Sequence, residues 1–324
     1  MSLRTTAVAL VAGGLLAGCA NPVSSPLVPS AASNQTRTQT QAFAKNAQRA
    51  EKPGTARVLY IADIDGQPGV GQVLVYSAKM KNPQLLQTIS SGTGRPFGLW
   101  VDSKNDLWVA NETDKYPAGV TAFKPGASSP FFTISSFKGQ PQSVAVDAKG
   151  DVFVNEAYGD EGYVQEFAPG SATAAQTIDT GVGGYAFTPG SMAFDPQGDL
   201  IVAEQAKLQL QIVRIAAGSS TVTPRNLDLN GNNINGPGMG IDKAGDIYVA
   251  SSEAATVSVF APGQTEPSRT IANVPAYGLT AVTPKGAVYQ ASGGYTVTEI
   301  AAGASTPTYT LTCECSAQGA AVSR

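Results

Sequence analysis

The sequence predicts an all-β protein, a six-bladed β-propeller, preceded by an export signal and a disordered tether. Three observations lead to this prediction. A short motif recurs six times, a continuous apolar strand follows most copies, and 35 glycines and 21 prolines accompany only 14% charged residues in the 324-residue chain. Such a composition is typical of many short strands joined by tight turns, and a propeller of this length folds as one unit.

The chain begins with the pattern of a bacterial signal peptide. Arg4 precedes an apolar run from residue 7 to residue 17, which is too short to span a bilayer as a helix. The run leads into Leu-Ala-Gly-Cys at 16–19, which resembles a bacterial lipobox. The resemblance implies cleavage before Cys19 and lipidation of Cys19. The alternative is an ordinary signal peptide with a cysteine at this place by chance.

A tether follows the lipidated cysteine. Residues 21–53 are rich in Ser, Thr, Gln, Ala and Pro without apolar periodicity, so they cannot bury a core. Residue 20 is not the aspartate that favours inner-membrane retention of enterobacterial lipoproteins. We therefore expect a signal peptide at 1–18, the lipidated cysteine and tether at 19–55, and the propeller at 56–324. The protein is expected to be exported and anchored to the outer membrane or the cell surface rather than to the inner membrane.

The recurring motif is a short strand that ends in an acidic or hydroxyl residue. Its six copies lie 40 to 48 residues apart, which is the period of one four-stranded blade. The copies are residues 98–102, 143–147, 191–195, 238–242, 279–283 and 319–323.

The first four copies continue into a turn that begins with aspartate. Three of these turns read Asp-x-x-Gly-Asp, and Asn105 takes the glycine position in the remaining one. An aspartate side chain can bond the backbone two residues on, and glycine or asparagine tolerates positive φ, so the pattern predicts a hairpin turn. The strands that follow, such as 107–109 and 152–154, are continuously apolar. They are therefore expected to be buried on both faces, as between neighbouring blades.

The phase of the repeat predicts how the ring closes. The first blade begins at its second strand, near residues 57–62, and the sixth copy of the motif arrives at 319–323, after the last blade. We expect this C-terminal segment to pair with the N-terminal strand as the innermost strand of the first blade. Closure would remove the exposed sheet edges that promote aggregation.

These repeats, with their Asp-x-x-Gly-Asp and Val-Ala-x elements, resemble the NHL family and the wider gluconolactonase-like group of six-bladed propellers over residues 57–323. The resemblance implies the fold. The Asn-x-Arg sequence that often follows in NHL repeats is absent from this chain, so the partner recognition of that family does not carry over.

The two ends of the predicted ring differ. One end carries the near-identical aspartate and Pro-Gly turns. The other carries loops of varied length that contain five tyrosines, namely Tyr116, Tyr158, Tyr185, Tyr277 and Tyr295. Tyrosine combines a rigid apolar ring with a polar tip, which favours a ligand-binding rim at this end. The alternative is that these rings pack their own loops.

Polar residues follow the second strand of each blade at the same end. They are Asp63, Asn111, Glu156, Glu204, Ser251 and Ser292. Pseudo-symmetry would gather them near the axis, where oxygen ligands suit calcium. The gluconolactonase-like resemblance implies a divalent ion at this end of the channel, although that family places its glutamate on an innermost strand. The predicted metal ligands are Asp63, Asn111, Glu156 and Glu204; the alternative is that they cap strand ends.

Two further features carry open alternatives. Trp100, which we also expect among the residues of the ligand-binding rim, stands where the other innermost strands have alanine or glycine. Its indole either partly plugs the channel and floors a ligand pocket or packs against a neighbouring blade. Cys313 and Cys315 alternate onto one side of an extended segment, which permits a disulfide in an oxidising compartment or two free thiols.

Composition limits the function. The chain has no histidine, the side chain used most for general base chemistry near neutral pH, and its net charge of −3 comes without a basic cluster for nucleic acid. We therefore expect a monomeric, non-catalytic binding or scaffolding module without a cofactor. Its expected partners are the membrane, through Cys19, and a protein, peptide or carbohydrate ligand. The alternative is a calcium-dependent lactonase or related hydrolase.

Overall fold

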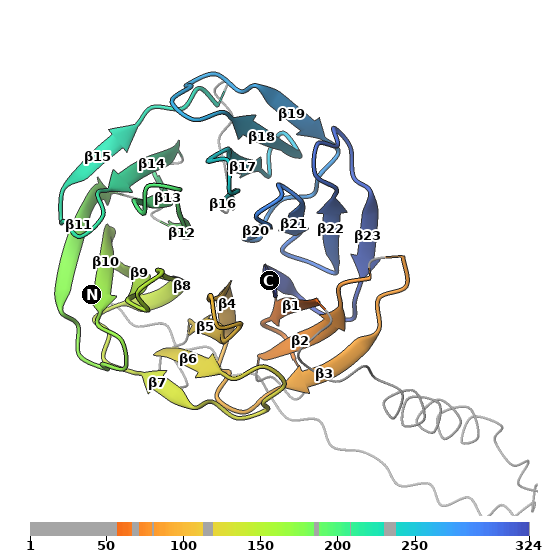
Figure 1. Ribbon diagram of the computed structural model, residues 1–324, viewed down its shortest axis with the longest axis horizontal. Helices are drawn as coiled ribbons and strands as arrows, with labels where there is room; N and C mark the ends of the chain where they lie inside the picture. Colours follow the sequence, from red (N-terminus) through yellow and green to blue (C-terminus); the bar gives the residue numbers. More distant parts are fainter. Residues whose placement is uncertain are drawn as a thin grey trace, which may run out of the picture. The chain divides into compact units, whose positions relative to one another are not determined.

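Six four-stranded antiparallel sheets surround a central axis like the blades of a propeller (Figure 1). The computed structural model describes residues 57–66, 71–79, 81–112, 119–184, 188–207, 209–229 and 238–323, which all belong to one compact unit. These residues form strands and turns and no helix, and thus none that could cross a membrane. The predicted signal peptide, the tether and Cys19 lie outside the described residues.

We number the blades along the chain and label the strands of each blade A to D from the axis outward. Blades 1 to 3 contain β24 (Ala317–Val322), β1 (Val58–Asp63), β2 (Gln72–Ser77) and β3 (Leu85–Ile89); β4 (Pro96–Val101), β5 (Leu107–Asn111), β6 (Gly119–Phe123) and β7 (Phe132–Ile134); and β8 (Gln140–Val146), β9 (Val152–Tyr158), β10 (Glu161–Phe167) and β11 (Gln176–Gly183).

Blades 4 to 6 follow the same order. They contain β12 (Thr188–Phe194), β13 (Leu200–Ala206), β14 (Gln209–Ile215) and β15 (Val222–Arg225); β16 (Met239–Ile241), β17 (Ile247–Ser251), β18 (Thr256–Phe260) and β19 (Arg269–Ala272); and β20 (Thr280–Val282), β21 (Val288–Ala291), β22 (Thr296–Ile300) and β23 (Tyr309–Thr312). We call the end with the A–B and C–D turns the turn end, and the end with the B–C loops and D–A crossovers the crossover end.

The C-terminal strand closes the ring, as the phase of the repeat predicts. β24 pairs with β1 in an antiparallel register that places Leu59 opposite Val322 and Ile61 opposite Ala320. At the turn end, the backbone N–H of Val58 donates to the hydroxyl of Ser323 at 2.8 Å. In Figure 1 the C-terminus lies among the innermost strands, beside β1. Blade 1 is therefore built from both ends of the chain.

The aspartate turns have the predicted geometry. Asp147 Oδ1 accepts hydrogen bonds from the backbone N–H groups of Lys149, Gly150 and Asp151, at 2.8, 2.8 and 2.9 Å. Gly150 has a φ of 96° and Asn105, its counterpart in blade 2, a φ of 61°. An L-residue without a short polar side chain would be strained in this left-handed region, which explains why the turns use glycine or asparagine.

The core is distributed among the interfaces between blades. Each of the six interfaces in the described structure has its own cluster of buried apolar side chains, and the B strands contribute to the clusters on both of their faces. In β5, for example, Leu107 and Val109 pack toward blade 1, and Trp108 and Ala110 pack toward blade 3. This confirms the prediction that the continuously apolar strands are buried on both faces.

Candidate binding rim

Two exposed tyrosines lie at the crossover end of blade 6. Tyr277 belongs to the crossover before β20 and Tyr295 to the loop between β21 and β22, and 56% and 70% of their surfaces are exposed. The two loops touch, because a Cβ added to Gly293 would lie 2.6 Å from the Cβ of Tyr277. Both rings are accessible to a partner.

The other three predicted rim tyrosines cannot be placed in the same way. Tyr116 and Tyr185 lie outside the described residues. Tyr158 ends β9 at the crossover end, and its side chain is likewise outside the described part. Tyr277 and Tyr295 therefore represent the predicted aromatic rim.

A disulfide supports the Tyr295 loop. Cys313 and Cys315 are bonded to each other, with their Cα atoms 5.2 Å apart. The backbone N–H of Cys313 donates to the carbonyl oxygen of Tyr295 at 2.9 Å. Of the two alternatives from the sequence, the structure has the disulfide, and Cys313 is hydrogen-bonded to the backbone of the loop that carries Tyr295.

Three of the four predicted metal ligands fasten the crossovers of their own blades. Each accepts a hydrogen bond from a backbone N–H just before its A strand. The pairs are Asp63 with Ser316 at 2.8 Å, Asn111 with Gly94 at 3.0 Å, and Glu156 with Gly139 at 2.9 Å. A side chain of the adjacent C strand also bonds each of them; Gln165 donates to Glu156 at 2.6 Å. These three side chains therefore fasten the start of each A strand to the end of the neighbouring B strand.

The arrangement corrects the expectation that these residues gather near the axis. Side chains alternate along a strand, so Asp63 shares the face of Leu59 and Ile61, which pack against blade 6. It points toward the neighbouring blade rather than into the channel. Among the described residues, no group of three His, Cys, Asp or Glu side chains is arranged to hold a metal ion. Ser251 and Ser292, at the same position in blades 5 and 6, accept hydrogen bonds from N–H groups of their own B–C loops.

Glu204, the fourth predicted ligand, lacks such a partner. It is fully buried on the face of β13 that packs against blade 3. Neither of its carboxylate oxygens has a hydrogen-bond partner among the described residues, nor do the side-chain polar atoms of Asn155. The nearby hydroxyl of Thr180 donates instead to the carbonyl of Gly162 at 3.1 Å. Burial raises the pKa of Glu204 to about 7, although interactions with Thr180 and Asn155 partly oppose the rise.

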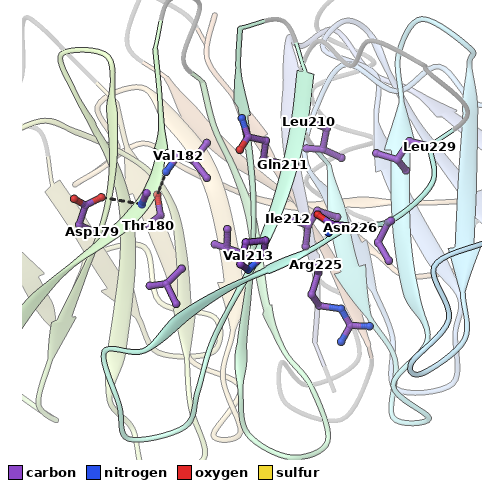
Figure 2. Close-up of a pocket in the computed structure, with 14 residues that line it drawn as sticks. Asp179, Thr180, Val182, Leu210, Gln211, Ile212, Val213, Arg225, Asn226 and Leu229 are labelled. Atoms are coloured by element: carbon purple, nitrogen blue, oxygen red, sulfur yellow. Dashed lines mark hydrogen bonds between the residues drawn. The ribbon is translucent and has the colours of Figure 1, made fainter.

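A pocket of about 580 Å³ is lined by Gln211, the cross-strand partner of Glu204 (Figure 2). Its walls come from β11, β14, β15 and residues 226–229, with Thr180 and Gln211 on the side of Glu204. Apolar side chains such as Ile212 and Leu229 line it together with two groups of opposite charge, Asp179 and Arg225. Arg225 has no ion-pair partner within the described ranges. An apolar pocket with a few polar groups is the usual form of a ligand site.

Sequence reasoning missed this pocket. None of its lining residues belongs to a recurring motif, because the site arises where two neighbouring blades depart from the common pattern. β11 has eight residues, against three to five in the other D strands, and contains Gly181 and Gly183. The greater length of the β11 segment was the feature of the sequence that could have indicated this pocket.

Trp100 does not lie on the rim. Its indole projects from β4 and packs against the clusters of three successive blade interfaces, with its ring centroid 6.2 Å from that of Phe194 in an edge-on arrangement. It lines a separate cavity on the axis, at the turn end. The indole thus combines both sequence alternatives, because it packs against neighbouring blades and also lines the axial cavity.

The fold and these sites define a class, the six-bladed β-propellers with an irregular crossover end. No protein-family model and no curated protein matches the sequence. Among solved structures, a protein of unknown function from Bacteroides caccae is similar, with a TM-score of 0.61 and 11% identity over 83% of this chain and 100% of that chain.

Two other solved structures are also similar. The nidogen/laminin complex matches with a TM-score of 0.62 and 16% identity over 83% of this chain and 98% of that chain. TolB from Acinetobacter baumannii matches with a TM-score of 0.62 and 10% identity over 92% of this chain and 74% of that chain. At these identities the likeness shows the fold.

Proposed function

We propose that the protein is a membrane-anchored binding module of the bacterial cell envelope, which presents the crossover end of its propeller to a peptide-bearing partner. The pocket between β11, β14 and β15 carries this proposal. Its apolar walls suit aliphatic side chains, and the opposite charges of Asp179 and Arg225 suit the charged groups of a peptide. Tyr277 and Tyr295 extend the surface at the same end with rings of the kind that dominates binding interfaces.

The proposal also includes the lipid anchor on Cys19 and the family resemblance of the repeats. A lipid on Cys19 and a tether to residue 55 would hold the propeller near a membrane, with the reach of a flexible chain. The proposed resemblance of the repeats to NHL and gluconolactonase-like propellers is based on their aspartate turns. One of the similar structures is a complex of nidogen with laminin, so a propeller of this fold takes part in a protein complex there.

The test is co-sedimentation of the full chain with isolated peptidoglycan sacculi, which contain both peptides and glycan strands. We expect retention of the wild type and a loss of at least fivefold in the triple variant Arg225→Ala, Tyr277→Ala, Tyr295→Ala. Lys285→Ala, an exposed change at the turn end, is the matched control and should bind as the wild type does. Removing the peptides with an amidase should abolish binding.

Three outcomes would contradict the proposal. The wild type is not retained by the sacculi; the triple variant binds as well as the Lys285 control; or amidase treatment leaves binding intact while digestion of the glycan removes it. The last outcome would assign the rim to a carbohydrate.

A second function, a metal-dependent hydrolase, draws on one observation. Glu204 is a buried carboxyl group with a raised pKa beside a pocket, and perturbed carboxyl groups gather at functional sites. A hydrolase that uses calcium should melt at a higher temperature in calcium than in chelator. Identical melting curves would argue against this function and leave the binding proposal standing.

A further inference from the structure

The axial cavity at the turn end is a second place where a ligand could bind. Its volume is about 780 Å³, and residues from all six A strands line it. Small-molecule sites have volumes of roughly 300–1,000 Å³. This cavity is distinct from the rim, because its mouth is formed by the aspartate turns at the opposite end of the ring.

The cavity narrows toward the crossover end, where neighbouring A strands approach each other. A Cβ on Gly278 would lie 2.6 Å from the carbonyl oxygen of Gln318, and one on Gly98 or Gly319 would collide with the backbone of the next blade. The hydrogen bond from the N–H of Leu279 to the carbonyl of Gln318, at 2.7 Å, joins two blades at this level. Glycine is required at these positions because only hydrogen fits.

Aromatic side chains line one wall of the cavity, and small residues line the opposite wall. Trp100 reaches past blade 3 to the cluster between blades 4 and 5. At the cluster between blades 3 and 4, Phe194 and Phe153 continue the aromatic surface, with their ring centroids 5.5 Å apart. Blades 5, 6 and 1 have Gly240, Ala281 and Ala321 at the position of the tryptophan. The remaining space therefore lies beside an indole, a shape that suits a flat ring.

Polarity along the cavity changes with depth. The charged lining residues lie in or beside the turns, and include Asp147, Lys149 and Lys243, whereas the deeper lining is uncharged. Uncharged hydrogen-bonding groups are nevertheless abundant there. The residues that flank β16, Gly238 and Asp242, form backbone hydrogen bonds with the blade's second strand and the turn before it. Because the bonded positions alternate along an antiparallel strand, the N–H and C=O groups of Met239 and Ile241 point away from β17, toward the axis.

Three buried side-chain atoms around the cavity add to these groups. The indole Nε1 of Trp100 and the hydroxyl oxygens of Ser143 and Ser191 have no hydrogen-bond partner among the described residues. A buried polar atom without a partner is unfavourable, so a bound molecule that supplies a partner would gain affinity. Two serine hydroxyls are few for a sugar, whose many hydroxyl groups would each need a partner.

We propose that the axial cavity binds a planar, uncharged heteroaromatic molecule of about one or two rings, stacked against Trp100 and bonded through amide-like donors and acceptors to the inner edges of the A strands. This site goes beyond the proposed function, since it uses the other end of the ring and takes a small molecule. The two can operate in one protein.

The test is NMR of the isotopically labelled full chain, titrated with adenine and with uracil as heteroaromatic probes and with glucose as a non-planar contrast. The chain has two tryptophans, and the indole of Trp108 is bonded to Asp102 at 3.1 Å. The indole signal that is missing from the spectrum of the Trp100→Phe variant is assigned to Trp100 in the wild-type spectrum. We expect a heteroaromatic probe to shift the Trp100 signal and leave that of Trp108 in place.

Variants separate this site from the rim. Trp100→Leu should weaken binding of the heteroaromatic probe at least tenfold, Trp100→Phe should retain binding within about fivefold, and Tyr277→Ala should bind as the wild type does. If Trp100→Leu does not fold, the Phe variant and the wild-type shifts still decide the question. The proposal is overturned if neither base shifts the Trp100 signal, if glucose shifts it as strongly, or if Tyr277→Ala loses as much affinity as Trp100→Leu. None of these results bears on sacculus binding.

Discussion

The carboxylate of Asp63 accepts a hydrogen bond from the backbone N–H of Ser316 at 2.8 Å, which joins residues 253 positions apart in the chain. Asp63 is buried, and its second oxygen accepts a hydrogen bond from Gln72 at 2.8 Å. With the bond from Val58 to Ser323 at the other end of β1, this contact fastens the C-terminal strand at both ends. The integrity of the rim and of the cavity depends on this closure.

Replacing Asp63 tests the contribution of the contact. Asp63→Ala should lower the free energy of unfolding by about 1–2 kcal/mol, because it leaves the half-buried N–H of Ser316 and the amide of Gln72 without this acceptor. Asp63→Asn keeps one acceptor oxygen and should cost less. Urea unfolding measures both, with the exposed Asp65→Ala as the control. Equal stability of the Asp63→Ala and Asp65→Ala variants would show that the contact adds nothing.

The close approach of the A strands gives a second prediction. Gly319→Ala places a methyl group against the carbonyl of Phe97, a backbone atom that cannot rotate away, and should cost about 1–3 kcal/mol. Gly294→Ala is the matched control, since its nearest neighbour would be the Ser292 hydroxyl at 3.7 Å. Thermal melting of the two variants distinguishes them. A Gly319→Ala protein that melts with the control would mean that the strands lie farther apart than described.

Glu204 gives a pH-dependent prediction. Its pKa rises from 4.5 to about 7 on folding, so the folded state holds a proton that the unfolded state releases between these values. Ionisation of the buried Glu204 carboxyl group therefore lowers the free energy of unfolding. This loss of stability is absent below pH 4.5, grows as the pH rises to 7, and then stays at about 3 kcal/mol. Glu204→Gln removes it.

The variant should therefore gain stability relative to the wild type as the pH rises from 4.5 to 7, measured by urea unfolding at several pH values. Glu161→Gln, an exposed change in the same part of the ring, should show no such trend. A difference between Glu204→Gln and the wild type that does not vary with pH would contradict the raised pKa of the buried carboxyl group.

The proposed lipidation of Cys19 would make membrane association depend on this one residue. Cys19→Ala should move the protein from the membrane fraction to the soluble exported fraction, because it removes the residue that would carry the acyl chains. Fractionation of the producing bacterium, with Cys315→Ser as a control for cysteine loss, measures this. A Cys19→Ala protein that stays in the membrane fraction would show that another feature anchors it.

The repeated parts of the fold could be predicted from the sequence because each is determined locally. The turn from Asp147 to Asp151 needs one aspartate and one glycine at fixed spacing, and the structure shows those contacts. The pairing of 319–323 with the first strand followed from counting strands, since a closed ring allows only one vacant position. Such features depend on period and spacing, which the sequence displays.

The sites depend on departures from the repeat, and these are harder to predict. Asp63 and Glu204 occupy the same position in their blades, yet one finds a backbone partner and the other is buried without a described one. The path of Trp100 across three interfaces depends on the small residues of other blades, so its position alone left two alternatives open.

Thermal unfolding of a chain that lacks residues 316–324 tests ring closure most directly, with a chain that lacks only Arg324 as the control. Removal of β24 exposes the inner edge of β1 and removes apolar contacts from the clusters on both sides of blade 1. We predict that the truncated protein shows no cooperative unfolding transition while the control melts like the intact chain. A truncated protein with the melting temperature and cooperativity of the intact protein would contradict the account.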